Sequence, residues 1–371
     1  MASMSCRVLL VESFYGGSHA AFADGLVSHS THRIDLMALP AQNWRWRTRT
    51  AALEFGAQLP DARQYDAALV TDLIDLADLK AIWSRSSPAI LLYVHESQLT
   101  YPYPKDRNPD MNTALQDIKN CLVADRVLFN SHVHRNAFLE RISAIIAKIP
   151  AGRRMEWRSD VGDKSTVVYP GIDIPAATLE AEQSNRPPRI LWNHRWEYDK
   201  RPGPFFRSLV KLAGEGLAFE VIVLGENPQV KPKEFLHARE ALGDRIIRWG
   251  YAESRREYEV WVAAADIVIS TAIQENFGIA VVEAIGAGCR PLLPRRLSYP
   301  EIIPEAFHDR VLYGNEADLL RKLRRLLTLE RRSLRLDELS KAMRRFAWDA
   351  VIDQYDSEIE TTVRSWRYQA P

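Results

Sequence analysis

The sequence predicts an α/β protein that contains two parallel-sheet domains. Three observations support this prediction: the chain has 371 residues, 46% of them are hydrophobic, and short apolar runs alternate with helix-length segments in both halves. At roughly 150 residues per domain, the length is enough for two domains. Strands that are buried on both faces form unbroken apolar runs, and strands that alternate with helices build parallel sheets.

The first half contains apolar runs with the length of buried strands. They cover residues 7–11, 67–71, 90–94 and 126–130. The first run is soon followed by Gly16-Gly17, which is typical of a turn between a strand and a helix. Apolar residues then recur near helical spacing, so we expect a strand, a tight turn and a helix in this order.

The alternation restarts in the second half, after a polar segment with several prolines. The apolar runs there cover residues 189–192, 219–225, 246–249, 267–270 and 290–293. Between two of them we expect a helix over Glu253–Ala265, because Tyr258, Trp261 and Val262 lie on one face. The expected organisation is a domain over 1–170, a linker over 171–188, a second domain over 189–345, and a C-terminal helix over 346–371 that packs back on the core.

Composition excludes several classes of protein. Lys and Arg total 49 and Asp and Glu total 48, so a net charge of +1 argues against a histone-like nucleic-acid binder, although a local basic patch stays possible. The 3 Cys form no C-x-x-C pair, which excludes a disulfide framework and a Cys-rich zinc site. No apolar run reaches about 18 residues, so we expect no membrane span and a soluble, cytoplasmic protein.

A basic stretch follows the last expected strand. Residues 318–346 hold ten Lys or Arg and four Asp or Glu, and Leu319, Leu323, Leu326 and Leu327 recur at helical spacing. This pattern predicts one or two amphipathic helices. Their basic face is either solvated or contacts a nucleic acid.

Ligands of open parallel sheets bind beyond the carboxyl ends of the strands, so the residues after each strand are candidates. The strongest group is the segment from Glu275 to Glu283. Glu275 is expected in a loop and Glu283 in the next helix, with backbone N–H groups of Asn276, Phe277 and Gly278 available to a phosphate or sugar. The alternative is a capping acid followed by an exposed Glu. Because this helix is apolar all round, Glu283 must be paired or bound to something.

Charged residues also follow the strand over 189–192. Arg195 and Lys200 lie five apart in a loop that leads into a helix, and they suit a clamp on two adjacent anionic oxygens. The alternative is a surface loop with ordinary charges. Similarly, His95 and Glu96 end the strand over 90–94, where His95 either has a structural role or orients a hydroxyl or accepts a proton.

We expect no metal site, because the 9 His show no H-x-x-x-H pattern and only scattered pairs such as His132 and His134. The segment 43–49 interleaves Trp44 and Trp46 with Arg45, Arg47 and Arg49. Trp and Arg planes stack on exposed bases, which suits a single-stranded RNA loop. The alternative is a buried Trp pair that the Arg side chains cover.

Four elements of the second half occur together in a known order. They are Arg195 with Lys200, the Gly250-Tyr251 turn, Ala264–Asp266, and the pair Glu275 and Glu283. They resemble the family 4 retaining glycosyltransferases of GT-B fold. The resemblance implies two Rossmann-like parallel-sheet domains that face each other across a cleft, where the donor binds.

The same resemblance implies roles for these residues. Arg195 and Lys200 would hold the donor diphosphate, the Gly250-Tyr251 turn would abut the nucleobase, Glu275 with Asn276–Gly278 would contact the transferred sugar, and Glu283 would take the ribose hydroxyls. Gly16-Gly17 and His95 match the positions that approach the donor phosphate and the reacting sugar. His95, Glu275, Arg195 and Lys200 would then be catalytic.

Further motifs, mostly of the first half, closely resemble the tRNA-queuosine α-mannosyltransferases. They are the segments 12–19, 39–50, 95–102, 121–131, 192–200 and 299–302. The resemblance implies transfer of mannose from GDP-mannose, with retention, to the cyclopentenediol of queuosine at the tRNA wobble position, with tRNA-Asp expected. The acceptor side would include His19, Trp44, Arg45, Trp46, Arg47, Arg49 and Glu96. We further expect no metal or other cofactor, no membrane partner and a monomer.

Two other functions stay open at this point. One is a retaining sugar transferase that acts on a lipid or small-molecule acceptor, although no amphipathic helix of membrane-surface type is evident in the first half. The other is an RNA-binding module without catalysis. The presence of Glu275, Glu283, Arg195 and Lys200 weighs against the latter.

Overall fold

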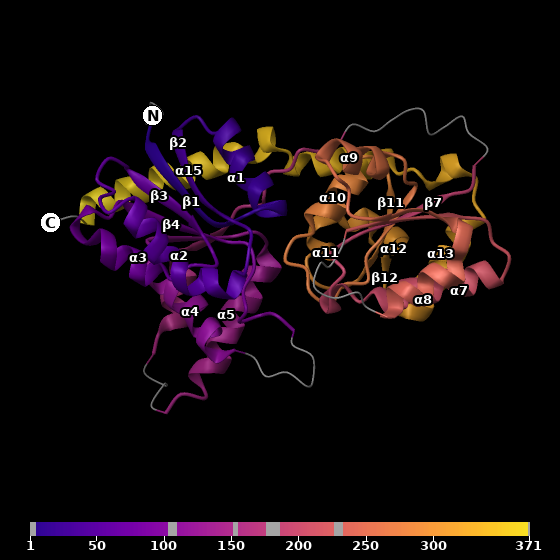
Figure 1. Cartoon of the computed structure of the whole chain (residues 1–371), viewed down its shortest axis with the longest axis horizontal. Coiled ribbons are helices and arrows are strands. Elements are labelled where there is room, and N and C mark those ends of the chain that lie inside the picture. Colours follow the sequence, from indigo (N-terminus) through magenta and orange to yellow (C-terminus); the bar gives the residue numbers. More distant parts are fainter. Residues whose placement is uncertain (1–4, 103–109, 151–154, 176–185, 226–232, 370–371) are drawn as a thin grey trace. The chain divides into compact units, whose positions relative to one another are not determined.

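The computed structural model describes residues 5–102, 110–150, 155–175, 186–225 and 233–369. The chain divides into two compact units, Met1–Ile172 with Phe346–Pro371, and Asp173–Arg345 (Figure 1). Of the predicted linker, residues 176–185 lie outside the described residues. Among the helices that are described, none is long and apolar enough to cross a bilayer.

In the described part of the first unit, six parallel strands form a sheet in the order β2-β1-β3-β4-β5-β6. They are β1 Arg7–Tyr15, β2 Arg33–Pro40, β3 Ala67–Thr71, β4 Ala89–Val94, β5 Arg126–Phe129 and β6 Ser165–Val167. The predicted strands correspond to β1, β3, β4 and β5 and are confirmed. The edge strands β2 and β6 were not predicted, because β2 is only partly buried and β6 has three residues.

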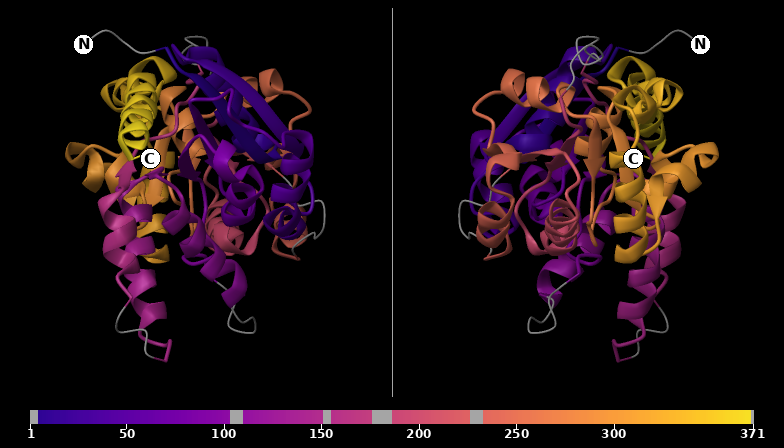
Figure 2. Two further views of the ribbon diagram at one scale, coloured as in Figure 1. Left: turned by 90° about the vertical axis from the view of Figure 1, so that its left-hand side faces the viewer. Right: turned by 90° about the vertical axis from the view of Figure 1, so that its right-hand side faces the viewer.

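Helices cover both faces of this sheet. They are α1 Gly17–His29, α2 Trp44–Gln58, α3 Leu76–Trp83, α4 Met111–Val123, α5 His132–Ile146, α6 Trp157–Asp163 and α15 Trp348–Gln369. Helices α2 to α6 contribute to one apolar core, and α1 and α15 to the other. Figure 2 shows α15 in yellow beside the indigo strands and helix of the N-terminal part.

Trp348 anchors α15. Its ring is 2% exposed and stacks on His29 with ring centroids 5.6 Å apart. A Cβ atom on Gly25 or Gly171 would lie 2.2 or 2.1 Å from this ring, so the indole fills the space that two glycines leave open. The C-terminal helix is therefore an integral part of the first unit.

In the described part of the second unit, six parallel strands have the order β12-β11-β10-β7-β8-β9. They are β7 Arg189–Asn193, β8 Glu220–Leu224, β9 Ile246–Gly250, β10 Ile267–Ile269, β11 Arg290–Pro294 and β12 Leu312–Tyr313. The predicted strands correspond to β7–β11 and are confirmed. The two-residue β12 is too short to give a sequence pattern.

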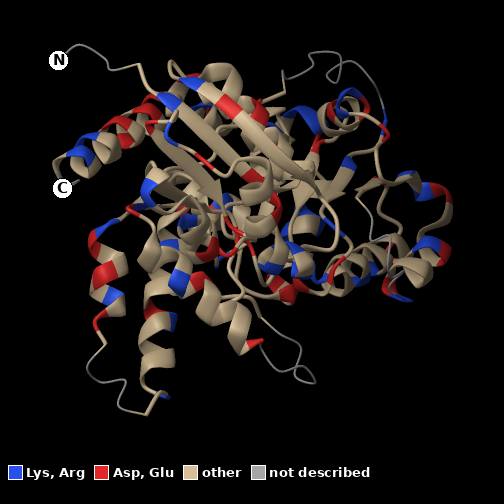
Figure 3. Cartoon of the chain, turned by 60° about the vertical axis from the view of Figure 1, so that its left-hand side comes forward, with Lys and Arg blue, Asp and Glu red and all other residues tan. Residues whose placement is uncertain are grey.

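The helices of the second unit are α7 Pro202–Gly214, α8 Lys233–Leu242, α9 Arg255–Ala263, α10 Ile279–Gly286, α11 Tyr299–Ile302, α12 His308–Val311, α13 Glu316–Leu327 and α14 Asp337–Ala342. The basic stretch forms α13 and α14, as predicted. Several of its cations have partners within the protein: Arg324 pairs with Glu215, and Lys322 donates to two backbone oxygens. Along α15 the acidic residues lie within Asp349–Glu360, and the basic Arg364 and Arg367 follow near the end of the helix (Figure 3).

Each strand order contains a point where successive crossovers reverse direction. In the first unit this point lies between β1 and β3, and in the second between β7 and β10. The carboxyl ends of strands at such a point open a crevice in which α/β proteins bind ligands. The two candidate regions described next lie at these points.

Candidate functional site

Lys200 and Glu275 lie together beyond the carboxyl ends of β7 and β10. The Lys200 ammonium donates to the backbone oxygen of Gln274 at 2.9 Å and to Oε2 of Glu275 at 3.3 Å, and Oδ2 of Asp199 is 3.1 Å away. Lys200 is 8% exposed, so its ammonium is a fixed charge between two carboxylates. The structure thus joins two residues that the sequence analysis assigned to different motifs.

Arg195 lies in a different environment. Its side chain is 59% exposed, and its guanidinium is 3.4 Å from a carboxylate oxygen of Glu197. An exposed Arg can reorient toward a ligand, whereas Lys200 is held by its neighbours. The two-cation clamp stays a prediction, in which Lys200 would be the fixed member and Arg195 the mobile one.

The loop before α10 contains Gly278 as the N-cap residue. Gly278 has φ 102°, a left-handed conformation that favours glycine. Phe277 is 2% exposed, and its backbone oxygen accepts a hydrogen bond from Ser298 at 2.8 Å. Asn276 accepts one from the Gln274 amide at 3.0 Å. Phe277 therefore has a packing role, and a ligand contact from this residue could come only from its backbone.

Glu283 is buried in α10 and has partners on both carboxylate oxygens. Nη1 of Arg255 lies 2.7 Å from Oε1, and the Tyr258 hydroxyl donates to Oε2 at 2.8 Å. Burial raises the pKa of Glu283, and the Arg255 guanidinium opposes that rise. The prediction that Glu283 needs a partner is confirmed, but sequence spacing did not point to Arg255.

The Gly250-Tyr251 turn ends β9. Gly250 has φ 109°, and a Cβ atom there would meet no heavy atom within 4 Å. The Tyr251 ring is 61% exposed, and its backbone oxygen accepts a hydrogen bond from Arg248 at 2.7 Å. The turn thus presents an open backbone and an aromatic face beside it, as contact with a nucleobase would require.

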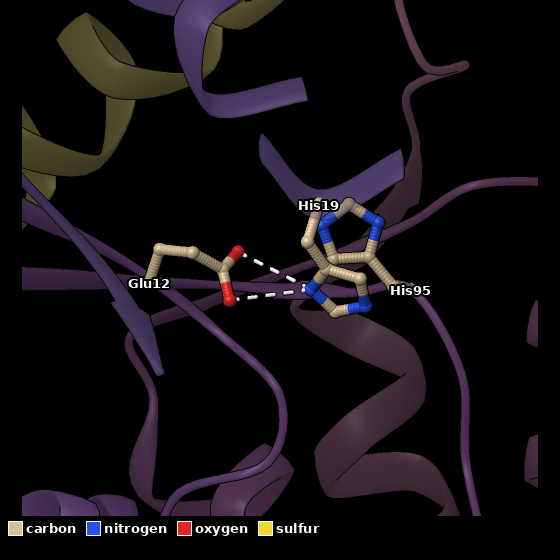
Figure 4. A group of neighbouring side chains, drawn as sticks. All are labelled: Glu12, His19 and His95. Atoms are coloured by element: carbon tan, nitrogen blue, oxygen red, sulfur yellow. Dashed lines mark hydrogen bonds and ion pairs between the residues drawn. The ribbon is translucent and has the colours of Figure 1, made fainter. Parts of the chain in front are cut away.

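In the first unit, Glu12, His19 and His95 meet at the ends of β1 and β4 (Figure 4). Nδ1 of His19 lies 3.2 and 3.3 Å from the two carboxylate oxygens of Glu12. The rings of His19 and His95 have centroids 4.3 Å apart. Glu12 also accepts a hydrogen bond from the backbone N–H of Phe14 at 2.8 Å, which fixes the carboxylate.

The two imidazoles differ in charge. Burial lowers the pKa of His19, but the hydrogen bond to Glu12 and the charges of Glu12, Asp72 and Glu96 outweigh burial and raise it above the ordinary value. Burial, together with the nearby His19, lowers the pKa of His95 well below its usual range. Between the lowered pKa of His95 and the raised pKa of His19, His95 is therefore a neutral imidazole beside an imidazolium that a carboxylate holds.

Asp72 supports the same region from the end of β3. It is 6% exposed, and its Oδ2 accepts a hydrogen bond from the backbone N–H of Glu96 at 2.8 Å. Burial raises the pKa of Asp72 to about 7. Sequence reasoning missed both Asp72 and Glu12. They directly follow the apolar runs over 7–11 and 67–71, and this position is the signal that could have identified them.

The turn after β1 contains Gly16 and Gly17, and their approach to a donor phosphate stays a prediction. Gly17 has φ 53°, and a Cβ atom on Gly16 would lie 2.5 Å from Cβ of Ala41. Both positions therefore need glycine, although the Gly16 requirement comes from Ala41 and is independent of any ligand.

Among the described residues, the group that could hold a metal ion is Glu12, His19 and His95, whose ligand atoms lie within 4.8 Å of one another. The His19 hydrogen bond already engages both oxygens of Glu12. We therefore interpret the group as a carboxylate–imidazole pair with a second imidazole beside it.

The Trp and Arg segment forms the first turns of α2. Trp46 is 68% exposed, so the alternative in which both Trp side chains are buried is wrong. The Arg45 guanidinium lies 5.1 Å from the centroid of Trp44, and Arg49 is exposed. Arg47 instead pairs with Glu54 at 3.0 Å. The surface open to a partner is formed by Trp46, Arg45 and Arg49.

Comparison with protein families identifies two matching regions. Residues 7–172 match the family model "tRNA-queuosine alpha-mannosyltransferase N-terminal", and residues 178–345 match "Glycosyl transferases group 1". A Drosophila melanogaster protein named tRNA-queuosine alpha-mannosyltransferase is 34% identical over 336 residues, which cover 86% of this chain and 87% of that protein.

Solved structures share the fold at low sequence identity. HepE of Anabaena, solved with UDP and glucose, has a TM-score of 0.69 at 13% identity and covers 96% of this chain and 100% of that chain. Sucrose-phosphate synthase of Thermosynechococcus elongatus has a TM-score of 0.73 at 14% identity and covers 97% and 100%. The predicted GT-B fold is confirmed.

Proposed function

Since the chain belongs to the tRNA-queuosine α-mannosyltransferase family, we propose that it transfers mannose from GDP-mannose to the cyclopentenediol of queuosine at the wobble position of a tRNA. We further propose that configuration is retained and that tRNA-Asp is the acceptor. The observation that carries the proposal is the 34% identity to a protein of that name over 86% of the chain.

The proposed reaction exchanges one bond to the sugar for another. The bond between the mannose C1 and the diphosphate oxygen breaks, and negative charge develops on the leaving GDP. A hydroxyl of the cyclopentenediol forms the new bond to C1 from the same side and passes its proton to a phosphate oxygen of GDP. Retention follows, because the acceptor arrives on the face that the leaving group vacates.

The residues of the second unit would stabilise the leaving group without a metal. Lys200 is a fixed charge between Asp199 and Glu275, and the exposed Arg195 can turn to the diphosphate. A cation that is already in place, as Lys200 is, stabilises developing charge without reorganisation. Glu275 would contact the transferred sugar, Glu283 the ribose, and Tyr251 with Gly250 the guanine.

The residues of the first unit would bind the acceptor. Trp46, Arg45 and Arg49 form an exposed aromatic and cationic surface on α2 that suits an anticodon loop. His19, His95 and Glu96 would orient the hydroxyls. The neutral His95 can accept or donate a hydrogen bond, whereas His19, at a pH below its raised pKa, can only donate.

The test is transfer to purified tRNA. The protein is incubated with GDP-mannose and with tRNA-Asp that carries queuosine, and the digested nucleosides are analysed by mass spectrometry. We expect one added hexose on queuosine and none on tRNA-Asp that carries guanosine at the wobble position. A chelator should leave the rate unchanged. Absence of transfer to fully modified tRNA, or transfer to a lipid extract in its place, would refute the proposal.

A further inference from the structure

Arg255 is the first residue of α9 and lies against the candidate donor region of the second unit. Its guanidinium contacts three acceptors: Oε1 of Glu283 at 2.7 Å, Oε1 of Glu259 at 2.7 Å and the backbone oxygen of Asp173 at 3.3 Å. The Arg255 side chain is 47% exposed, whereas that of Glu283 is 7% exposed. The pair thus links a solvated cation to a buried carboxylate.

The second oxygen of Glu283 is held from inside the unit. The Tyr258 hydroxyl donates to Oε2 of Glu283 at 2.8 Å and accepts a hydrogen bond from the Asn193 amide at 3.0 Å. The same amide donates to the backbone oxygen of Ala280 in α10 at 2.8 Å. The carboxylate is therefore held from both sides, by Arg255 and by Tyr258, and has one orientation.

This arrangement leaves capacity for a ligand. An ionised carboxylate has about four acceptor sites on its two oxygens, and Arg255 and Tyr258 take one on each oxygen. One site remains on each oxygen. Two adjacent acceptors of this kind match a vicinal diol, whose hydroxyls each donate one hydrogen bond. A protonated Glu283 would lose this match, because one oxygen would then carry a hydrogen.

We propose that Arg255 is a positioning residue of the donor site, which holds Glu283 ionised and oriented so that it accepts hydrogen bonds from both hydroxyls of a ribose. The inference rests on the proposed function, in which Glu283 takes the ribose of the donor nucleotide. Arg255 is not among the site residues that the sequence suggested. The ribose diol is the group of the donor whose binding depends on Arg255.

The experiment compares nucleotides with and without one ribose hydroxyl. Calorimetry gives the Kd of GDP and of 2′-deoxy-GDP for the wild-type protein and for Arg255→Met, which keeps the apolar stem. Wild type should bind GDP about tenfold more tightly than 2′-deoxy-GDP. In Arg255→Met the Kd of GDP should rise to nearly that of 2′-deoxy-GDP, while the Kd of 2′-deoxy-GDP should rise less, because that nucleotide has only its 3′-hydroxyl left to donate to Glu283.

Two further variants separate positioning from a general effect. Arg207→Met removes an Arg that pairs with Glu316 on the surface of the same unit, and it should change neither Kd. Arg255→Lys should restore part of the preference for GDP.

A pH series gives a further measurement, which would not change if the role of Arg255 were only structural. The Kd of GDP for Arg255→Met should fall as the pH rises. Among the described residues, Glu259 and Tyr258 then face Glu283, which ionises without its cation.

The results test the role of Arg255 separately from the proposed function. Equal weakening of GDP and 2′-deoxy-GDP in Arg255→Met, or no change in either, would overturn the role of Arg255. If GDP does not bind, UDP is compared with 2′-deoxy-UDP, and ADP with 2′-deoxy-ADP. A loss of preference in one of those pairs would support Arg255 and refute GDP as the donor nucleotide, whereas a retained preference, or no binding at all, would overturn both.

Discussion

Nδ1 of His19 lies 3.2 Å from Oε1 of Glu12, a carboxylate whose side chain is fully buried. Glu12 belongs to β1 and His19 to α1, and the turn at Gly16-Gly17 lies between them. A buried carboxylate is stable only when it is paired or hydrogen-bonded. The pair therefore fixes the first turn of α1 as well as the charge of the imidazole.

Replacement of Glu12 by Gln should change how the free energy of unfolding depends on pH. Because the pKa of folded His19 is raised above 6.5, the pair stabilises the protein fully below that value and less as the pH rises through the raised pKa. The E12Q variant should be less stable than wild type by about 1–3 kcal/mol at acidic pH. Urea unfolding at several pH values should show this deficit shrink at alkaline pH. A deficit that is constant with pH would contradict the prediction.

Substitutions of Lys200 and of Arg195 should differ in their effects on stability and on GDP binding. Lys200→Met would leave Asp199, whose side chain is 1% exposed, without its cation, so we expect a loss of about 3 kcal/mol in the free energy of unfolding. Arg195→Met should leave stability unchanged, because the side chain is 59% exposed, and should weaken GDP binding. Urea unfolding and calorimetry measure the two effects. GDP affinity that survives both substitutions would show that neither cation holds the diphosphate.

Trp46→Ala should weaken binding of the tRNA anticodon arm without unfolding the protein. A base stacked on an aromatic ring contributes about 1–3 kcal/mol, and the 68% exposed Trp46 makes few packing contacts to lose. Fluorescence anisotropy with labelled tRNA measures the change. Tyr368→Ala is the matched control, since Tyr368 is 92% exposed on α15. Equal tRNA affinity of wild type and Trp46→Ala would remove α2 from the proposed RNA surface.

Trp348→Ala should destabilise the protein by about 3–5 kcal/mol, because the indole is 2% exposed and fills the space over Gly25 and Gly171. Gly25→Ala should destabilise it as well, since the new methyl group would lie 2.2 Å from the ring. Thermal and urea unfolding measure both. Full stability of Trp348→Ala would mean that α15 is not required by the core of the first unit.

The central strands could be predicted because each is an unbroken apolar run that is buried on both faces, as in Ala67–Thr71 and Ala89–Val94. The edge strand Arg33–Pro40 could not, because it is only partly buried and alternates weakly. The start of α2 was also missed. Asn43 is a favourable N-cap residue type, but the Trp and Arg residues that follow it give no apolar face, and in the structure Asn43 has φ 50° and makes no side-chain cap hydrogen bond.

The motif residues of the site could be predicted, but their partners could not. Lys200 and Glu275 were identified from separate motifs, and only the strand order β10-β7 shows that they meet. Likewise, β1 and β3 pair in the register Val11 with Val70, which places Glu12 and Asp72 at neighbouring strand ends. Such pairings depend on tertiary structure, and no local spacing encodes them.

The return of the chain at Phe346 has a consequence for biosynthesis. The backbone N–H of Ile172 donates to the oxygen of Phe346 at 2.9 Å, so the chain leaves the first unit and re-enters it at adjacent points. The second unit is thus topologically an insertion within the first. During translation the second unit is complete before α15 emerges from the ribosome. Until α15 is made, the apolar face of the N-terminal sheet that Trp348 and Tyr355 cover therefore stays exposed.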